Sequence, residues 1–182
     1  MNPLDIINKY YADNDPLREL LIKHSVQVTD RAIKIANEQK ALAIDKAFVV
    51  QAAMLHDIGI FLTDAPGIYC YGKEPYLLHG YLGGQLMRKE GYDDIARVCE
   101  RHTGTGLTSA TIKALQLPLP PADYCPETIE EQLICYADKF YSKSHPDRER
   151  SAADTAKSLE KFGHEGVDIF WKWVELFEPN LL

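Results

Sequence analysis

Four histidines and two aspartates recur along the chain in a fixed order, each within or at the end of a segment with helical periodicity. They are His24, His56, Asp57, His79, His102 and Asp138. Four of the six have apolar residues three or four positions away, as Leu21 and Val28 flank His24, so they belong to helix sides that face a core. Burying unpaired His and Asp side chains is costly. The pattern therefore predicts a fold in which separate helices bring these residues together around a shared ligand.

Helical periodicity runs through most of the chain, and no segment alternates apolar and polar residues over a useful length. The expected helices cover residues 3–12, 15–40, 45–57, 76–90, 92–102, 108–116, 149–162 and 165–177, with a further helix carrying Asp138 between 123 and 144. Asp15 and Asp45 are the expected N-caps of the second and third helices. The sequence predicts an all-α protein. Its 182 residues predict one domain, with a core at about 20–145 and closing helices over 149–177.

The chain has a net charge of −7 and no evident basic stripe, which disfavours binding of a nucleic-acid duplex through bulk electrostatics. An acidic protein that handles phosphates has to supply positive charge locally, and bound metal ions do this. The chain has no C-x-x-C pair, signal peptide or transmembrane run. These features predict reduced thiols and a cytoplasmic protein without membrane contact, and they leave the oligomeric state open.

The adjacent pair His56-Asp57 is suited to a metal centre. One ion can take the imidazole nitrogen and one carboxylate oxygen, and the second Asp57 oxygen can reach a neighbouring ion. A set of histidines and carboxylates suits Fe, Mn, Co, Ni or Zn better than Ca, so we expect one or two such ions. Two ions can activate water and polarise a phosphoryl oxygen. The pattern indicates hydrolysis of a phosphate ester or anhydride by metal-bound hydroxide; the alternative is a set of unrelated polar residues at helix ends.

In order and in local sequence, these residues resemble the HD-domain superfamily of metal-dependent phosphohydrolases, in its HDIG variety. The resemblance covers about residues 20–145 and rests on four strings: His24-Ser25-Val26, Ala52-Ala53-Met54-Leu55-His56-Asp57-Ile58-Gly59, His79-Gly80-Tyr81-Leu82-Gly83 and Tyr136-Ala137-Asp138-Lys139. It implies an all-helical bundle with the metals at its centre. His102 is followed by Thr103 and not by a second histidine, which is a departure from the cyclic-dinucleotide phosphodiesterase branch.

The resemblance also implies a division of labour among the six residues. The first metal would be bound by His24, His56, Asp57 and Asp138. The second would be bound by His79 and His102, with Asp57 bridging; where one metal is present, the two histidines would hold substrate phosphate. Asp57, His79 and His102 are therefore the expected catalytic residues, and a nucleotide or another small phosphorylated metabolite is the expected substrate.

Two other functions share the same ligands. Some HD-fold proteins, such as myo-inositol oxygenase, use this ligand order to hold two irons and activate dioxygen. A non-enzymatic sensor is the third reading, which the complete set of six ligands disfavours. Oxygen consumption with substrate and a mixed-valence di-iron EPR signal would distinguish the oxygenase.

Three further features bear on the site. Lys139 is expected to contact the substrate phosphate or else to be a solvated lysine, and Thr103, in the turn 103–106, is expected to contact an anion. The aromatic, Gly- and Pro-containing segment 61–77 joins the His-Asp pair to His79, and it predicts either a lid over the pocket or a plain connector. His145 and His164 lie outside the pattern and are expected at the surface.

Overall fold

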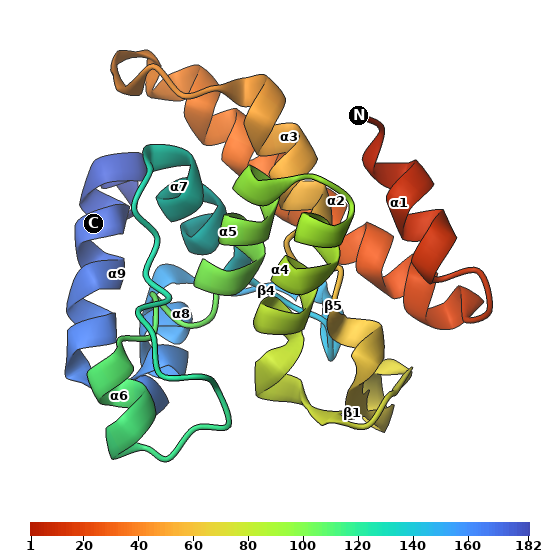
Figure 1. Ribbon diagram of the computed structural model, residues 1–182. Helices are drawn as coiled ribbons and strands as arrows, with labels where there is room; N and C mark the ends of the chain where they lie inside the picture. Colours follow the sequence, from red (N-terminus) through yellow and green to blue (C-terminus); the bar gives the residue numbers. More distant parts are fainter.

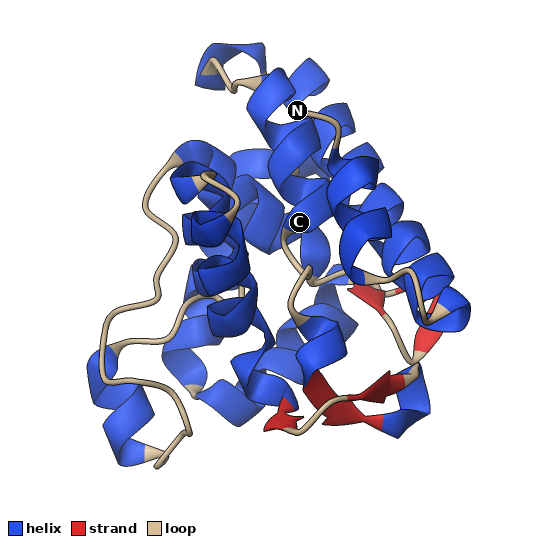
Figure 2. Ribbon diagram, turned by 45° about the vertical axis from the view of Figure 1, so that its right-hand side comes forward, coloured by secondary structure: helices blue, strands red, loops and turns tan.

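Helices build most of this computed structural model, which describes residues 1–182 apart from the side chain of Phe162. The α-helices are α1 (Pro3–Tyr10), α2 (Asp15–Glu38), α3 (Lys46–Leu55), α4 (His79–Lys89), α5 (Asp93–Arg101), α6 (Ser109–Ala114), α7 (Ile129–Asp138), α8 (Ala152–Leu159) and α9 (His164–Phe177). The predicted all-α class is confirmed. The short strands are β1 (Thr63–Ala65), β2 (Cys70–Tyr71), β3 (Glu74–Pro75), β4 (Tyr141–Ser142) and β5 (His145–Glu149). They lie together at one side of the bundle (Figure 2).

Side-chain caps begin the long helices. Asn14 caps α2, because its side chain accepts a hydrogen bond from the Leu17 amide at 3.2 Å. The prediction that Asp15 is the cap is wrong by one position, since Asp15 is the first helical residue. Asp45 caps α3 as predicted and accepts from the Phe48 amide at 3.0 Å.

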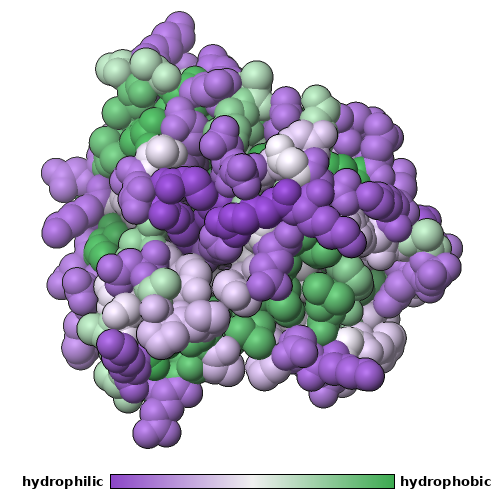
Figure 3. All heavy atoms as spheres, viewed as in Figure 1, coloured by the Kyte–Doolittle hydropathy of each residue, from purple (hydrophilic) through white to green (hydrophobic). Residues whose placement is uncertain are grey.

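The central element is α2, which packs against α3 and α7, while α4 packs against α5 (Figure 1). The main hydrophobic cluster runs from Ile6 in α1 to Phe177 in α9, and burial of its apolar surface provides the main driving force for folding. The side of α5 that faces away from the core is charged. In the view of Figure 1, a band of hydrophilic residues crosses the surface of the molecule (Figure 3). Within the described residues, no helix combines the length and the apolar character needed to cross a membrane.

The chain departs from the predicted helices after Asp138, where we expected helical structure to continue to Ser144. Instead α7 ends, and β4 and β5 form an antiparallel hairpin. Phe140 is buried at the turn, and the guanidinium of Arg31 lies 3.3 Å from the centroid of its ring. The backbone carbonyl of Phe140 accepts a hydrogen bond from the Arg150 amide at 2.8 Å. These tertiary contacts outweigh the weak local preference for helix. The strands are too short to leave an alternating pattern in the sequence.

The segment 61–77 is ordered by a small sheet with strand order β2-β1-β3. The amide of Gly72 donates to the carbonyl of Thr63 at 2.8 Å, and the Thr63 side chain is buried. Tyr69 and Tyr71 are exposed, at 47% and 69%. The segment is therefore a structured connection between the end of α3 and the start of α4.

Two glycines allow backbones to pass close to each other beside the predicted site. A Cβ on Gly59 would lie 2.3 Å from the carbonyl oxygen of His79, and a Cβ on Gly80 would lie 2.4 Å from the carbonyl oxygen of Cys99. Both obstacles are backbone atoms, which cannot swing away as a flexible side chain can. Gly59 thus sets how closely the turn after Asp57 approaches α4.

We predict that Gly59→Ala destabilises the protein by about 3 kcal/mol, because the added methyl group overpacks this contact. Gly67→Ala is the matched control, since a Cβ there meets no atom within 4 Å, and it should change the free energy of unfolding by less than about 0.5 kcal/mol. Urea unfolding of both variants measures the difference. Equal stability of the two variants would contradict the role given to Gly59.

Candidate metal centre

The six polar residues predicted from the sequence converge, although they come from five different helices. They are His24 within α2, His56 and Asp57 directly after α3, His79 at the start of α4, His102 directly after α5 and Asp138 at the end of α7. All are buried or nearly so. The bundle therefore gathers four imidazoles and two carboxylates in its interior.

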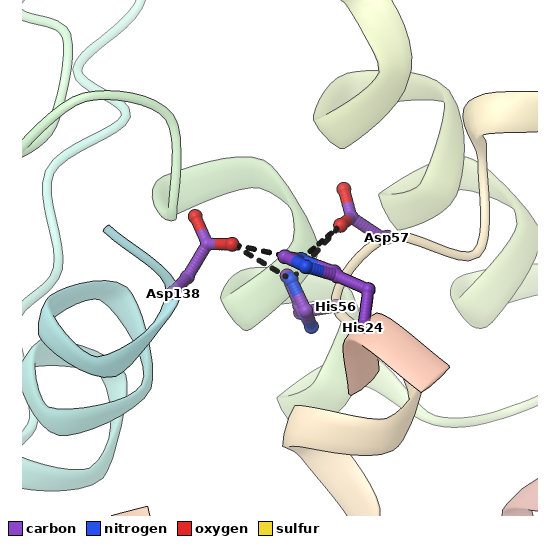
Figure 4. A group of neighbouring side chains, drawn as sticks. All are labelled: His24, His56, Asp57 and Asp138. Atoms are coloured by element: carbon purple, nitrogen blue, oxygen red, sulfur yellow. Dashed lines mark hydrogen bonds and ion pairs between the residues drawn. The ribbon is translucent and has the colours of Figure 1, made fainter. Parts of the chain in front are cut away.

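Four of these residues form a first group (Figure 4). Asp57 and Asp138 face each other across the two imidazole rings. The Nε2 atom of His24 lies 3.1 Å from Asp57 Oδ2 and 3.0 Å from Asp138 Oδ1. The Nε2 atom of His56 lies 3.0 Å from Asp57 Oδ2 and 3.4 Å from Asp138 Oδ1. Two nitrogens and two oxygens thus surround one point.

The other oxygen of Asp57 belongs to a second group. Asp57 Oδ1 lies 3.3 Å from His79 Nε2 and 3.4 Å from His102 Nε2, and these two nitrogens are 2.9 Å apart. Asp57 is the residue common to both groups. Its two oxygens therefore point to two neighbouring positions, the arrangement that a bridging carboxylate needs.

Three of the histidines are oriented in the same way by the backbone. The Nδ1 atoms of His56, His79 and His102 each lie 2.7 Å from the carbonyl oxygen three residues earlier in the chain. A carbonyl oxygen can only accept, so each Nδ1 carries a hydrogen and each Nε2 is directed to the centre, where the neutral ring offers its lone pair. For His56 and His102 the acceptors are carbonyls in the last turn of α3 and α5, which lack partners within their helices. This is the second contact that metal-binding histidines usually make.

The inward atoms fit a shared ion better than they fit one another. His56 Nε2 and Asp57 Oδ1 have no well-formed hydrogen bond among the described residues, although neighbouring atoms lie at hydrogen-bond distance. Ligands about 2.1 Å from one ion, at angles between those of an octahedron and a tetrahedron, are separated by about 3.0–3.4 Å. The four nitrogen–oxygen separations in the first group are 3.0–3.4 Å. The donor atoms and their spacing therefore fit a divalent transition-metal ion.

The electrostatics of the cluster also favour a cation. Burial by itself would lower the pKa of His56, but the carboxylates of Asp57 and Asp138 raise it to about 9. Burial would likewise raise the pKa of Asp57, and the nearby Lys143 and His56 hold it well below its usual range. The ends of α3, α5 and α7 add the negative poles of three helix dipoles. At the second group, burial lowers the pKa of His79 to about 3, so this imidazole stays neutral and able to coordinate.

Two lysines border the cluster. Lys139 is nearly buried, and its Nζ atom donates at 2.7 Å both to the His102 carbonyl and to Asp138 Oδ2. The alternative that Lys139 is a solvated lysine is wrong. The Nζ atom of Lys143 lies 2.5 Å from Asp57 Oδ2. Sequence analysis missed Lys143, because its approach to Asp57 depends on the unpredicted β4–β5 hairpin and leaves no local signal.

A pocket of about 460 Å³ opens beside the second group. It is lined by Ile68, Tyr76, Leu77, His79, His102, Thr103, Gly104, Asp138, Lys139, Tyr141, Ser142, Lys143, Ser144, Arg150, Ser158, Leu159 and Lys161. Segment 61–77 contributes Tyr76, which stacks on the His79 ring at 4.7 Å between centroids, whereas Tyr69 and Tyr71 are exposed elsewhere. The segment thus forms part of the pocket wall. His145 and His164 are exposed, as predicted.

A helical bundle that gathers histidines and aspartates from five helices is the fold and site of an HD domain. The family model for the HD domain matches residues 21–142, and the chain belongs to this family. This confirms the resemblance that the sequence motifs indicated. Comparison with solved structures returned no match.

Three curated proteins are similar to this chain. The tRNA (cytidine(56)-2'-O)-methyltransferase of Thermoplasma volcanium is 36% identical over 140 residues, which are 76% of this chain and 35% of that enzyme. The enzyme of the same name from Picrophilus torridus is 36% identical over 125 residues, 68% of this chain and 32% of the enzyme. An uncharacterized protein of Methanocaldococcus jannaschii is 34% identical over 125 residues, 67% of this chain and 66% of that protein. The chain thus spans about a third of the length of the two methyltransferases.

We predict that Asp57→Asn lowers the metal content of the purified protein, because Asp57 is common to both groups. If the free ion is present at about 100 times its dissociation constant, removing it with a chelator should lower the free energy of unfolding of the wild type by about 3 kcal/mol. Adding Mn²⁺ should restore that stability. The control is His145→Ala, at an exposed position outside the cluster. Elemental analysis and melting curves with and without EDTA measure both effects. Wild-type metal content in Asp57→Asn would rule out this site.

Proposed function

We propose that this chain is a metal-dependent phosphohydrolase that acts on a phosphate ester or anhydride of a small metabolite, such as a nucleotide. The observation that carries this proposal is the position of Asp57. Its two oxygens face two groups of imidazole nitrogens, and the second group opens into a pocket bordered by Lys139 and Lys143. A wall with positive charge suits a phosphate.

His24, His56, Asp57 and Asp138 would hold a first divalent ion, and Asp57, His79 and His102 a second one or, in its place, the substrate phosphate. An ion held there lowers the pKa of a bound water from about 15.7 toward 7 and polarises a phosphoryl oxygen. His79 stays unprotonated at neutral pH, so it binds without competing for the proton of that water. Lys139, Lys143 and Thr103 border the space for the phosphate, where the two lysines neutralise its charge.

The similar methyltransferases do not make methyl transfer the best proposal for this chain. The chain corresponds to about a third of their length. We propose that methyl transfer depends on the part of those enzymes that lies outside the matched region. Their names make RNA a second candidate partner, beside the small substrate that the pocket favours.

The oxygenase remains the rival function, because its ligands are the same. The pocket favours hydrolysis, because four cationic side chains line it, and such a lining suits a phosphate better than an uncharged hydroxylated substrate. Metal analysis of anaerobically purified protein, followed by a screen of nucleotides and phosphate esters with Mn, Co and Fe, tests the proposal. Release of phosphate would support it. Oxygen consumption with a mixed-valence di-iron EPR signal, and no phosphate release, would instead support the oxygenase.

We predict that Lys143→Met lowers kcat/KM for the best phosphate substrate by about 10- to 100-fold, as expected for one lost charge-assisted hydrogen bond. Metal content should stay at the wild-type level, because Lys143 is not among the residues that could ligate an ion. Lys157→Met is the control, at an exposed position of α8 that does not line the pocket. Unchanged turnover in Lys143→Met would remove Lys143 from the proposed mechanism.

A further inference from the structure

The pocket extends beyond the metal cluster. One end is formed by His79, His102 and Asp138, and the lining continues to Arg150 after β5 and to Ser158 and Lys161 in and after α8. A volume of about 460 Å³ falls within the range of pockets that hold drug-sized ligands and is too large for a phosphate group alone. The pocket therefore has room for a second part of a ligand beside the hairpin and α8.

Arg150 distinguishes this outer part of the pocket. The backbone of Arg150 is held by its hydrogen bond to Phe140, and its side chain is partly buried in the pocket wall. Lys139 and Lys143 are paired with Asp138 and Asp57. By contrast, the guanidinium of Arg150 has no ion pair or hydrogen bond with any residue that the structure describes, and the nearby Asp154 pairs with Arg148.

A partly buried guanidinium without a carboxylate partner suits an anion, because its fork of donors matches a phosphate in two hydrogen bonds. Two serine hydroxyls of the hairpin line the same pocket and add a further donor: the Oγ atoms of Ser142 and Ser144 lie 2.9 Å apart. Ile68, Tyr76, Leu77 and Leu159 give the same pocket an apolar lining. Cationic, hydroxyl and apolar groups are the complement of an organic molecule with two anionic groups.

We propose that Arg150 binds a second phosphate of the substrate, so that the substrate class is a nucleotide-sized molecule with two separate phosphate groups. One phosphate lies at the His and Asp cluster, and the other lies at Arg150 with the serines. This inference rests on the proposed phosphohydrolase function for its first phosphate. The second subsite is formed by residues outside the six-residue cluster.

The test compares adenosine 3',5'-bisphosphate with adenosine 5'-monophosphate on the metal-loaded full chain. Arg150→Met should raise KM for the bisphosphate by about 10- to 100-fold, as expected for one charge-assisted hydrogen-bonding group, and leave KM for the monophosphate within about twofold. Arg148→Met is the matched control, because Arg148 lies on the same hairpin, is exposed and does not line this pocket. Arg150→Lys should recover part of the loss. Equal changes for both substrates, or none, would overturn the proposal.

A binding measurement separates this inference from the proposed function. Calorimetric titration of the same proteins with both nucleotides needs no turnover. If the wild type releases no phosphate but binds the bisphosphate more tightly than the monophosphate, and Arg150→Met alone abolishes that preference, the second subsite stands while the hydrolase fails. If the wild type binds both nucleotides equally, the second subsite fails whatever the activity. A 5'-phosphorylated dinucleotide, in which the second phosphate is a diester, distinguishes an RNA end from a free nucleotide as the source of that phosphate.

Discussion

The buried carboxylate of Asp57 is the interaction on which the rest of the site depends. It lies in the interior, where an isolated negative charge is costly. Lys143 offsets part of that cost, and His24, His56, His79 and His102 surround the carboxylate with nitrogens that can share an ion with it. These partners come from α2, α4, α5 and the hairpin, as well as from the residue before Asp57 itself. Because one charge is shared among so many elements, the bundle has to close around Asp57 in one arrangement.

The geometry that presents the imidazoles follows from where helices end. A helix leaves its last carbonyl groups without internal partners, and the rings of His56 and His102 take up such carbonyls through Nδ1. Each ring is thereby held with Nε2 directed inward. The same helix ends add negative potential at the centre. The same contacts thus satisfy backbone carbonyls and direct the imidazoles to the cation site. The close approach at Gly59 and Gly80 brings α4 and α5 near enough to place His79 and His102 there.

The outer wall of the pocket and the six-residue cluster come from different parts of the chain. The six-residue cluster lies within the region matched by the HD domain family. Lys143 and Arg150 come from the hairpin and its edge, beyond α7. The chain thus combines a family core with a wall supplied by the hairpin and α8. Under the proposed function, this wall rather than the cluster would select the substrate.

The sequence by itself determined the helices, the order of the six polar residues and their convergence. Helical periodicity, the cap at Asp45 and burial of polar residues on apolar helix sides are local properties that a pattern records. The tertiary structure alone decided the hairpin after Asp138, the burial of Lys139 and the contact of Lys143 with Asp57. Each of these depends on side chains far away in the sequence, such as Arg31 over Phe140, whose combined stabilisation exceeds the local preference for helix. Short strands and long-range ion pairs leave no periodic signal, so they emerge only when the chain packs.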